Sequence, residues 1–161
     1  MIHVRRAGAL DSRSMAELLN QIIAKGGTTA LVKPVTARDI SDWMNTNADM
    51  SAWSVATDSE ENVHGFQWIA PHPDLPPEAC DVASFVRIGQ TGLGIGSKLF
   101  EATVQNARAL GYSWICACIR ADNEGGLIYY QSRGFEDYGL VRDAQLDDGR
   151  RVDKVLKRYD L

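Results

Sequence analysis

Apolar and polar positions follow two periods along the chain, and these periods predict helices and strands in a mixed order. Residues 12–25 carry apolar side chains at helical spacing, and two glycines at 26–27 end the helix. Residues 80–88 instead alternate between two faces, as a strand does. In chain order the pattern predicts strand 2–7, helices 12–25 and 36–45, strands 52–57, 63–70 and 80–88, helix 95–110, strand 112–120, helix 124–133, and strands 135–142 and 150–157.

The alternation in strand 80–88 separates its side chains into two sets. Cys80, Val82, Ser84, Val86 and Ile88 face one side, and Asp81, Ala83, Phe85 and Arg87 face the other. The order of elements, βααβββαβαββ, predicts an α/β (α+β) sandwich around one sheet. A length of 161 residues is that of a single domain, 1–161, with one substantial core.

Composition narrows the class of protein. A formal net charge of −4 argues against nucleic-acid and membrane partners, which require clustered Lys and Arg. No apolar run approaches the roughly 20 residues that span a bilayer, and the first residues lack the apolar core of a signal peptide. We therefore expect a cytoplasmic protein. Cys80, Cys116 and Cys118 are expected to be small buried apolar residues rather than metal ligands, so no metal is predicted.

A glycine-rich turn at residues 89–96 runs directly into the predicted helix 95–110. Glycines let the backbone approach a ligand closely, and the unpaired N–H groups at a helix start favour a phosphate. A nucleotide P-loop would require Gly-Lys-Ser/Thr, which is absent from the sequence. A dinucleotide fold would place the turn after the first strand and an acid about 20 residues later, where this chain has an apolar strand.

A third phosphate-binding pattern fits the turn and its surroundings. Gly94-x-Gly96-x-x-Leu99-Phe100 is followed by a helix, a strand, and then Asn123-x-x-Gly126-x-x-Tyr129-Tyr130-x-x-x-Gly134-Phe135. This pair of motifs at this separation resembles the acetyl-CoA-dependent N-acetyltransferase superfamily known as GNAT. The resemblance covers residues 80–137 closely, and the strand order extends it to the whole chain. It implies a mixed, mostly antiparallel central sheet with helices on both faces, and acetyl-CoA as co-substrate.

The resemblance also assigns residues to the cofactor. The backbone of the glycine turn would bind the CoA pyrophosphate, and the pantetheine would exchange hydrogen bonds with the backbone of Val86 and Ile88, a form of strand addition. Asn123 matches the asparagine that contacts the cofactor in this superfamily. The implied cofactor-binding residues are Val86, Ile88, Leu93, Gly94, Ile95, Gly96, Ser97, Lys98 and Asn123.

Two residues are candidates for proton transfer. Tyr130 matches the superfamily's tyrosine near the CoA sulfur, a general acid toward the departing thiolate. The base in the superfamily is commonly a carboxylate on or near the central strand, which points to Asp81, with Glu78 as a substitute. The alternative for Asp81 is a solvated carboxylate at a strand end.

The motif departs from the superfamily at one position. The superfamily has Arg or Gln three residues before the first motif glycine, whereas this chain has Thr91 there and Gln90 one step earlier. The pyrophosphate is then held mainly by backbone, or by Gln90 through a local bulge. A register on Gly92 and Gly94 is the other option, but it loses the Leu-Phe match.

Short stretches point to an acceptor. Asn20 with Thr28-Thr29-Ala30, and Gly149-Arg150-x-x-Asp153, resemble the phosphinothricin and amino-acid N-acetyltransferase branch. That branch acetylates small amines that carry a carboxylate and is usually dimeric, so the implied partners are a small-molecule amine and a second copy of the chain. The alternatives are a protein or peptide N-terminal acetyltransferase, and a non-catalytic acyl-CoA-binding sensor.

Overall fold

A computed structural model describes residues 1–90 and 94–161 of the chain. Its helices are α1 (Ser12–Lys25), α2 (Ala37–Asn45), α3 (Ile95–Ala109) and α4 (Glu124–Ser132). Its strands are β1 (His3–Arg6), β2 (Ala52–Thr57), β3 (Val63–Ala70), β4 (Ala79–Val86), β5 (Trp114–Arg120), β6 (Glu136–Gln145) and β7 (Arg151–Asp160). The predicted order of helices and strands is confirmed, and short 3₁₀ turns at Ala9–Asp11 and Ala48–Met50 were not predicted.

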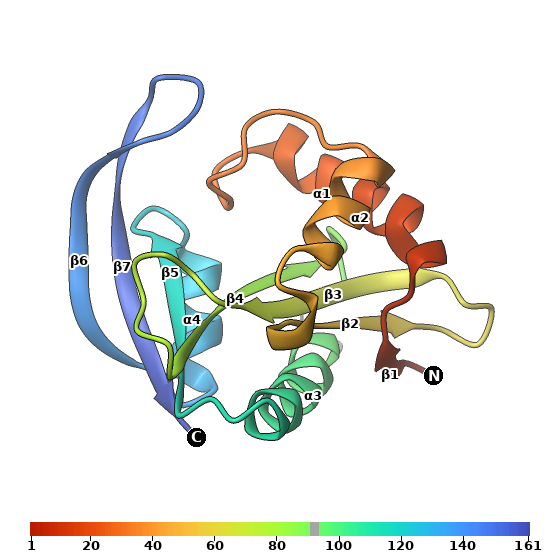
Figure 1. The fold of residues 1–161 in the computed structure, drawn as a ribbon. Helices are drawn as coiled ribbons and strands as arrows, with labels where there is room; N and C mark the ends of the chain where they lie inside the picture. The colour runs from red at the N-terminus through yellow and green to blue at the C-terminus, as the bar shows by residue number, and fades with distance from the viewer. Residues whose placement is uncertain (91–93) are drawn as a thin grey trace.

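The strands form one sheet in the order β1-β2-β3-β4-β5-β7-β6. Within the described part of the chain, neighbouring strands are antiparallel except β4 and β5, which are parallel. Helices α1 and α2 cover one face, while α3 and α4 lie against the other (Figure 1). This arrangement is the mixed, mostly antiparallel sheet with helices on both faces that the sequence predicted.

Each helix forms where its local sequence and its apolar face agree. Helix α1 buries Met15, Leu18 and Leu19 completely against the sheet. Helix α2 begins with a capping box, because Thr36 accepts from the N–H of Asp39 while the Asp39 carboxylate accepts from the N–H of Thr36. These two helices therefore form a stable layer over β2 and β3.

Two predicted features differ in the structure. Strand β4 ends at Val86 rather than at residue 88, because Gly89 takes a φ of 85° and the N–H of Gln90 donates to the Arg87 carbonyl, which closes a turn. Ile88 therefore lies in a turn. Cys80 and Cys116 are buried as predicted, but Cys118 is exposed, so the prediction of a buried residue was wrong there.

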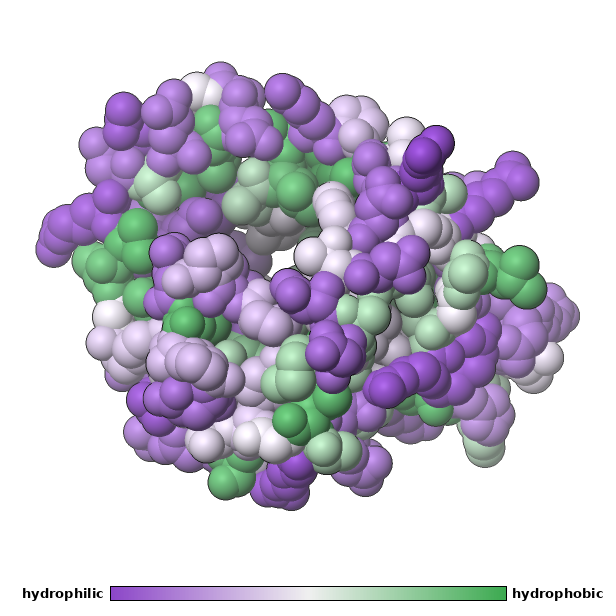
Figure 2. Space-filling view, viewed as in Figure 1, coloured by the Kyte–Doolittle hydropathy of each residue, from purple (hydrophilic) through white to green (hydrophobic). Residues whose placement is uncertain are grey.

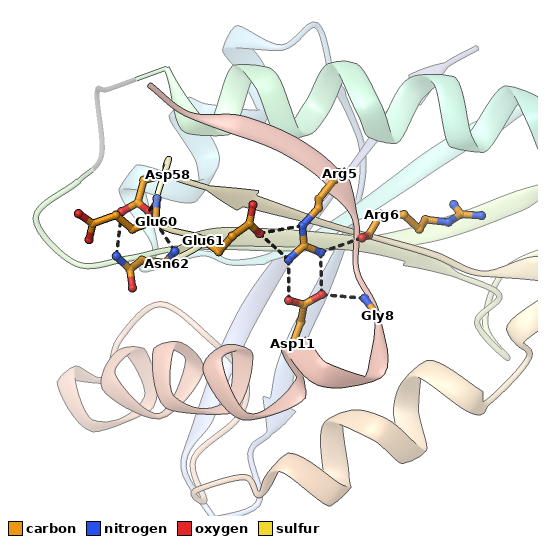
Figure 3. A network of polar contacts seen from close by, with 8 residues as sticks. All are labelled: Arg5, Arg6, Gly8, Asp11, Asp58, Glu60, Glu61 and Asn62. Atoms are coloured by element: carbon orange, nitrogen blue, oxygen red, sulfur yellow. Dashed lines mark hydrogen bonds and ion pairs between the residues drawn. The ribbon is translucent and has the colours of Figure 1, made fainter.

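An arginine on the first strand ties three segments together at the rim of the sheet. Arg5 forks onto both carboxylate oxygens of Asp11, at 2.8 and 2.9 Å, and also reaches Glu61 in the β2–β3 turn at 3.2 Å (Figure 3). The N–H of Gly8 donates to the same Asp11 carboxylate.

None of the helices in the described part of the chain has the length and apolar content that a membrane span requires.

Candidate active site

The sheet opens between β4 and β5. Their parallel pairing extends only from Ala79 opposite Trp114 to Asp81 opposite Cys116, although both strands continue further. Beyond Asp81, β4 is hydrogen-bonded to β3 on its other edge only. Since the N–H of Arg87 donates to the His64 carbonyl of β3, the alternation of an antiparallel pair turns the backbone of Val86 toward the opening.

A cavity of about 770 Å³ lies at this opening. It is lined by β3 and β4, by the turn after β4, by the first turn of α3, by α4 and by the end of α1. Figure 2 shows a hollow in the surface between the α1–α2 layer and the β6–β7 hairpin, bordered by both hydrophobic and hydrophilic side chains. Among the predicted site residues, the cavity brings together Val86, Ile88, Gly94, Gly96, Ser97, Asn123 and Tyr130.

The first turn of α3 presents free donors to the cavity. Gly94 is the N-cap with φ 77°, and the first intrahelical hydrogen bond runs from the N–H of Lys98 to the Gly94 carbonyl. The N–H groups of Ile95, Gly96 and Ser97 therefore have no partner within the helix. Within the described residues no side chain caps this helix, so its positive end is open to an anion.

The two motif glycines are required for different reasons. Gly94 needs glycine for its backbone, because its φ is positive while an added Cβ would meet nothing within 4 Å. Gly96 needs glycine for space, because an added Cβ would lie 2.7 Å from Cε1 of Tyr129. The second glycine thus allows Tyr129 to pack directly on the start of α3.

Two predicted cofactor residues are placed differently from the others, and a third lies outside the described residues. Ile95 is 1% exposed and packs in the core, so only its backbone can serve the cavity. Lys98 turns away, since its Nζ donates to the Ile2 carbonyl at 3.0 Å. Leu93, like Thr91, lies outside the described residues. For these residues, contact with a cofactor stays a prediction.

Arg133, at the end of α4, places a positive charge beside the start of α3. Its Nη1 donates to the Ser97 hydroxyl, and the side chain lines the cavity. Its Nε is buried and has no hydrogen-bond partner among the described residues. Sequence reasoning missed Arg133, because it comes from a different helix than the glycine turn.

Gln90 also lines the cavity, where a histidine holds its side chain. His64 pairs with Gln90 through Nδ1 and with Asp58 through Nε2, the latter at 2.7 Å. The His64 hydrogen bond, the largest cause, holds the pKa of Asp58 well below its usual range. Gln90 is therefore fixed at the cavity edge.

Asn123 ties α4 to the segment after α1. Its carbonyl oxygen accepts from the N–H of Gly126 and caps α4, while its amide donates to the Thr28 carbonyl, both at 3.0 Å. The side chain of Asn123 thus fixes the start of α4 beside the cavity.

Tyr130 is buried at the cavity wall. It is 7% exposed, and its hydroxyl lies 2.7 Å from the Ser84 hydroxyl. Burial raises the pKa of Tyr130 far above its usual value, against a smaller lowering by the Ser84 hydrogen bond. The phenol is thus protonated at neutral pH, as a general acid requires.

Asp81 lies at the last position at which β4 is paired with β5. Its side chain is on the face opposite to Ser84 and is half-buried. Burial raises the pKa of Asp81 to about 6, against lowering by the positive charges of His72 and Lys154. Asp81 does not line the cavity that contains Tyr130. The acid candidate and the base candidate therefore approach the parting of β4 and β5 from opposite faces of the sheet.

Three further polar residues at the cavity were not predicted. Gln67 on β3 is 1% exposed, and its amide nitrogen donates to Ser84 at 2.7 Å and to the Tyr129 hydroxyl at 3.1 Å. Tyr129 in turn donates to the Gly96 carbonyl at 2.8 Å. One signal was available, since Gln67 is a polar residue within an apolar strand, whereas the contacts of Ser84 depend on the tertiary fold.

The fold and the site together define a class. In its architecture, and in sequence over nearly its full length, the chain is similar to acetyltransferases that include a GNAT-superfamily structure, which agrees with the motifs. No protein-family model matches the chain.

Two relatives and one solved structure that resemble the chain over most of its length are named as acetyltransferases. The chain is 28% identical over 159 residues to a Bacillus subtilis protein named "putative phosphinothricin acetyltransferase YwnH", covering 96% of this chain and 97% of that one. It is 27% identical to the L-methionine sulfoximine/L-methionine sulfone acetyltransferase of Pseudomonas aeruginosa, over 98% of this chain and 94% of that one. A solved structure of a GNAT-superfamily phosphinothricin acetyltransferase from Sinorhizobium meliloti, in complex with acetyl-CoA, superposes with a TM-score of 0.89. It is 22% identical, and the match covers 99% of this chain and 88% of that chain, which shows the fold.

Proposed function

We propose that this protein transfers an acetyl group from acetyl-CoA to the primary amine of an amino acid or a close analogue. One observation carries the proposal: a single cavity, at the parting of two parallel strands, joins an uncapped helix N-terminus to a buried, protonated tyrosine. Two relatives that match over nearly the whole chain are named for acetylation of phosphinothricin and of L-methionine sulfoximine and L-methionine sulfone.

Different residues at the cavity suit the pyrophosphate and the pantetheine of acetyl-CoA. The free N–H groups of α3 and the guanidinium of Arg133 suit the pyrophosphate, because helix N-termini and arginines both bind phosphate oxygens. The backbone of Val86, turned into the opening, suits the amides of pantetheine. Bound there, the cofactor supplies an acetyl thioester to the acceptor.

Two side chains would move protons in this reaction. Asp81 accepts the proton that the attacking amine loses, directly or through water, because its pKa near 6 leaves it ionised at neutral pH. Tyr130 donates its proton to the sulfur as the carbon–sulfur bond breaks. The raised pKa of Tyr130 keeps that proton in place until negative charge develops.

The acceptor side carries positive charge suited to a carboxylate. Asp81 is paired with Cys116 of β5 and shares its face of the sheet. Lys154 lies on that same face, because it is paired with Arg120, four residues after Cys116 on β5. Lys154 is half-buried and has no ion-pair partner among the described residues. An amino acid offers both the amine for Asp81 and the carboxylate for Lys154.

The test is a thiol-release assay with acetyl-CoA and a panel of amino acids, amino-acid analogues, polyamines and short peptides. Turnover with amino acids or their analogues, and none with the same compounds lacking a carboxylate, is the expected result. Turnover with peptides alone would replace this proposal with a protein N-terminal acetyltransferase. Tight CoA binding without turnover on any acceptor would indicate a sensor.

We also propose a homodimer in the cytoplasm. Tyr138, Leu140 and Val141 are exposed on β6, which lies at the edge of the sheet opposite to β1, and a second copy would cover them. The free cysteines suit a reducing compartment. Light scattering after gel filtration measures the dimer, and a monomeric mass at micromolar concentration would contradict it.

A further inference from the structure

Tyr130 ends a chain of hydrogen bonds that begins at the glycine turn. Tyr129 donates to the Gly96 carbonyl at 2.8 Å, and Gln67 Nε2 lies 3.1 Å from the Tyr129 oxygen. The same Nε2 lies 2.7 Å from the Ser84 oxygen, and Ser84 lies 2.7 Å from the Tyr130 oxygen. The chain runs across β3, β4, α3 and α4 along one side of the cavity.

The direction of these bonds follows from counting protons. A carbonyl only accepts, so the single hydroxyl proton of Tyr129 is committed to Gly96. The Tyr129 oxygen must then accept from Gln67, which fixes the amide with its nitrogen toward Tyr129 and Ser84. A flipped amide would place an oxygen against the Tyr129 oxygen with no proton between them.

Ser84 consequently accepts from Gln67 and keeps its own proton. That proton can go to Tyr130, or Tyr130 can donate to Ser84. Once Tyr130 has lost its proton, only the first arrangement remains, because the phenolate can only accept. Ser84 then donates to a charged oxygen, and such charge-assisted bonds are about twice as strong as neutral ones.

We infer that Gln67 and Ser84 are positioning residues that stabilise the phenolate formed when Tyr130 protonates the leaving thiolate. This inference rests on the proposed function. In the step, the amine nitrogen bonds to the thioester carbon, the carbon–sulfur bond breaks, and sulfur takes the Tyr130 proton. Ser84 and Gln67 hold the resulting phenolate until solvent returns the proton that the amine has released to Asp81.

The experiment is a double-substitution cycle of Ser84→Ala and Tyr130→Phe, measured on kcat. Ser84→Ala is expected to lower kcat by about 10-fold to about 100-fold, because hydrogen bonds to charged groups have this strength. The KM for acetyl-CoA is expected to change less than about 3-fold. In the Tyr130→Phe background, Ser84→Ala should change kcat less than about 2-fold, since no phenolate forms.

Controls separate positioning from a structural role. Ser84→Thr keeps the hydroxyl and is expected to restore most of the lost kcat. Ser12→Ala removes another buried serine, bonded to Ser41 away from the cavity, and should leave kcat unchanged. In urea unfolding without cofactor, Ser84→Ala and Tyr130→Phe together should lower the midpoint by less than their sum, because they remove the same hydrogen bond.

The outcomes distinguish this inference from the proposed function. A wild-type kcat in Ser84→Ala, or an equal loss in the Tyr130→Phe background, overturns the role of Ser84 and leaves the proposed acetyltransferase intact. Unchanged turnover in Tyr130→Phe alone removes both the tyrosine acid and its positioning residues. If none of the tested acceptors is acetylated, the proposed function is overturned. The urea-unfolding cycle still reports on the Ser84–Tyr130 hydrogen bond in that case.

Discussion

The second glycine of the turn gives the sharpest test of the structure. In Gly96→Ala, the new Cβ would lie 2.7 Å from Cε1 of Tyr129, so the ring must move. Movement of the ring breaks its bond to the Gly96 carbonyl and the bond it accepts from Gln67. The same substitution in a helix without this ring would be favourable, because alanine is the better helix former.

The size of the effect follows from these parts. Overpacking costs about 1–3 kcal/mol, and each lost hydrogen bond about 1 kcal/mol. The gain in helix propensity offsets up to about 1 kcal/mol. We expect Gly96→Ala to lower the free energy of unfolding by about 2–4 kcal/mol, equivalent to a fall in Tm of roughly 5–15 °C.

The assay is urea unfolding, without cofactor, of Gly96→Ala, Tyr129→Ala and the double variant. With the ring removed, Gly96→Ala should stabilise the protein by about 0.5–1 kcal/mol, which reverses its sign. Gly94→Ala is the matched control: nothing lies near its Cβ, so its cost of about 1–2 kcal/mol comes from positive φ and should persist in Tyr129→Ala. A stabilising Gly96→Ala in the wild-type background would refute the contact.

Three further substitutions test the cavity and the proposed base. Tyr130→Phe should lower kcat by about 100-fold or more with little change in the affinity for CoA, measured by thiol release and calorimetry. Asp81→Asn should abolish the rise of kcat/KM through pH 6 that the wild type is expected to show, since only the carboxylate accepts a proton. Because the folded pKa of Asp81 lies above its unfolded value, ionisation destabilises the fold. Asp81→Asn should therefore be more stable than wild type at pH 8 and equal to it only at about pH 3 and below, where the carboxyl is protonated in both states. Arg133→Met should weaken CoA binding about 10-fold with kcat nearly unchanged, and equal affinity in calorimetry would remove Arg133 from the phosphate site.

Elements with strong local signals could be predicted from the sequence. Helix α1 runs over Ser12–Lys25 as expected, because glycines at 26–27 with positive φ end it. The end of β4 was predicted two residues too late, because the alternation of side chains continues to Ile88 while the hydrogen bond from Gln90 to the Arg87 carbonyl already closes a turn there.

In the candidate site, too, residues within a local motif could be predicted, and residues that depend on tertiary contacts could not. Tyr130 and the start of α3 were found because their motifs are contiguous in the sequence. Arg133, Gln67 and Ser84 were missed because their partners come from other elements, and no spacing along the chain encodes a contact between β3 and α4. The opposite placement of Asp81 and Tyr130 likewise depends on which face of the sheet α4 covers.

Beyond Asp81 and Cys116 the facing edges of β4 and β5 are unpaired. The concentration of the cofactor can therefore affect how much of the protein is folded, in addition to the rate of the reaction. A cofactor bound as proposed fills this gap only in the folded protein, so binding shifts the folding equilibrium by mass action. At a hundred times its Kd this linkage is worth about 2.7 kcal/mol, a large fraction of the stability of an ordinary domain. When acetyl-CoA falls toward its Kd this stabilisation is lost, and a larger fraction of the protein is unfolded and open to proteolysis.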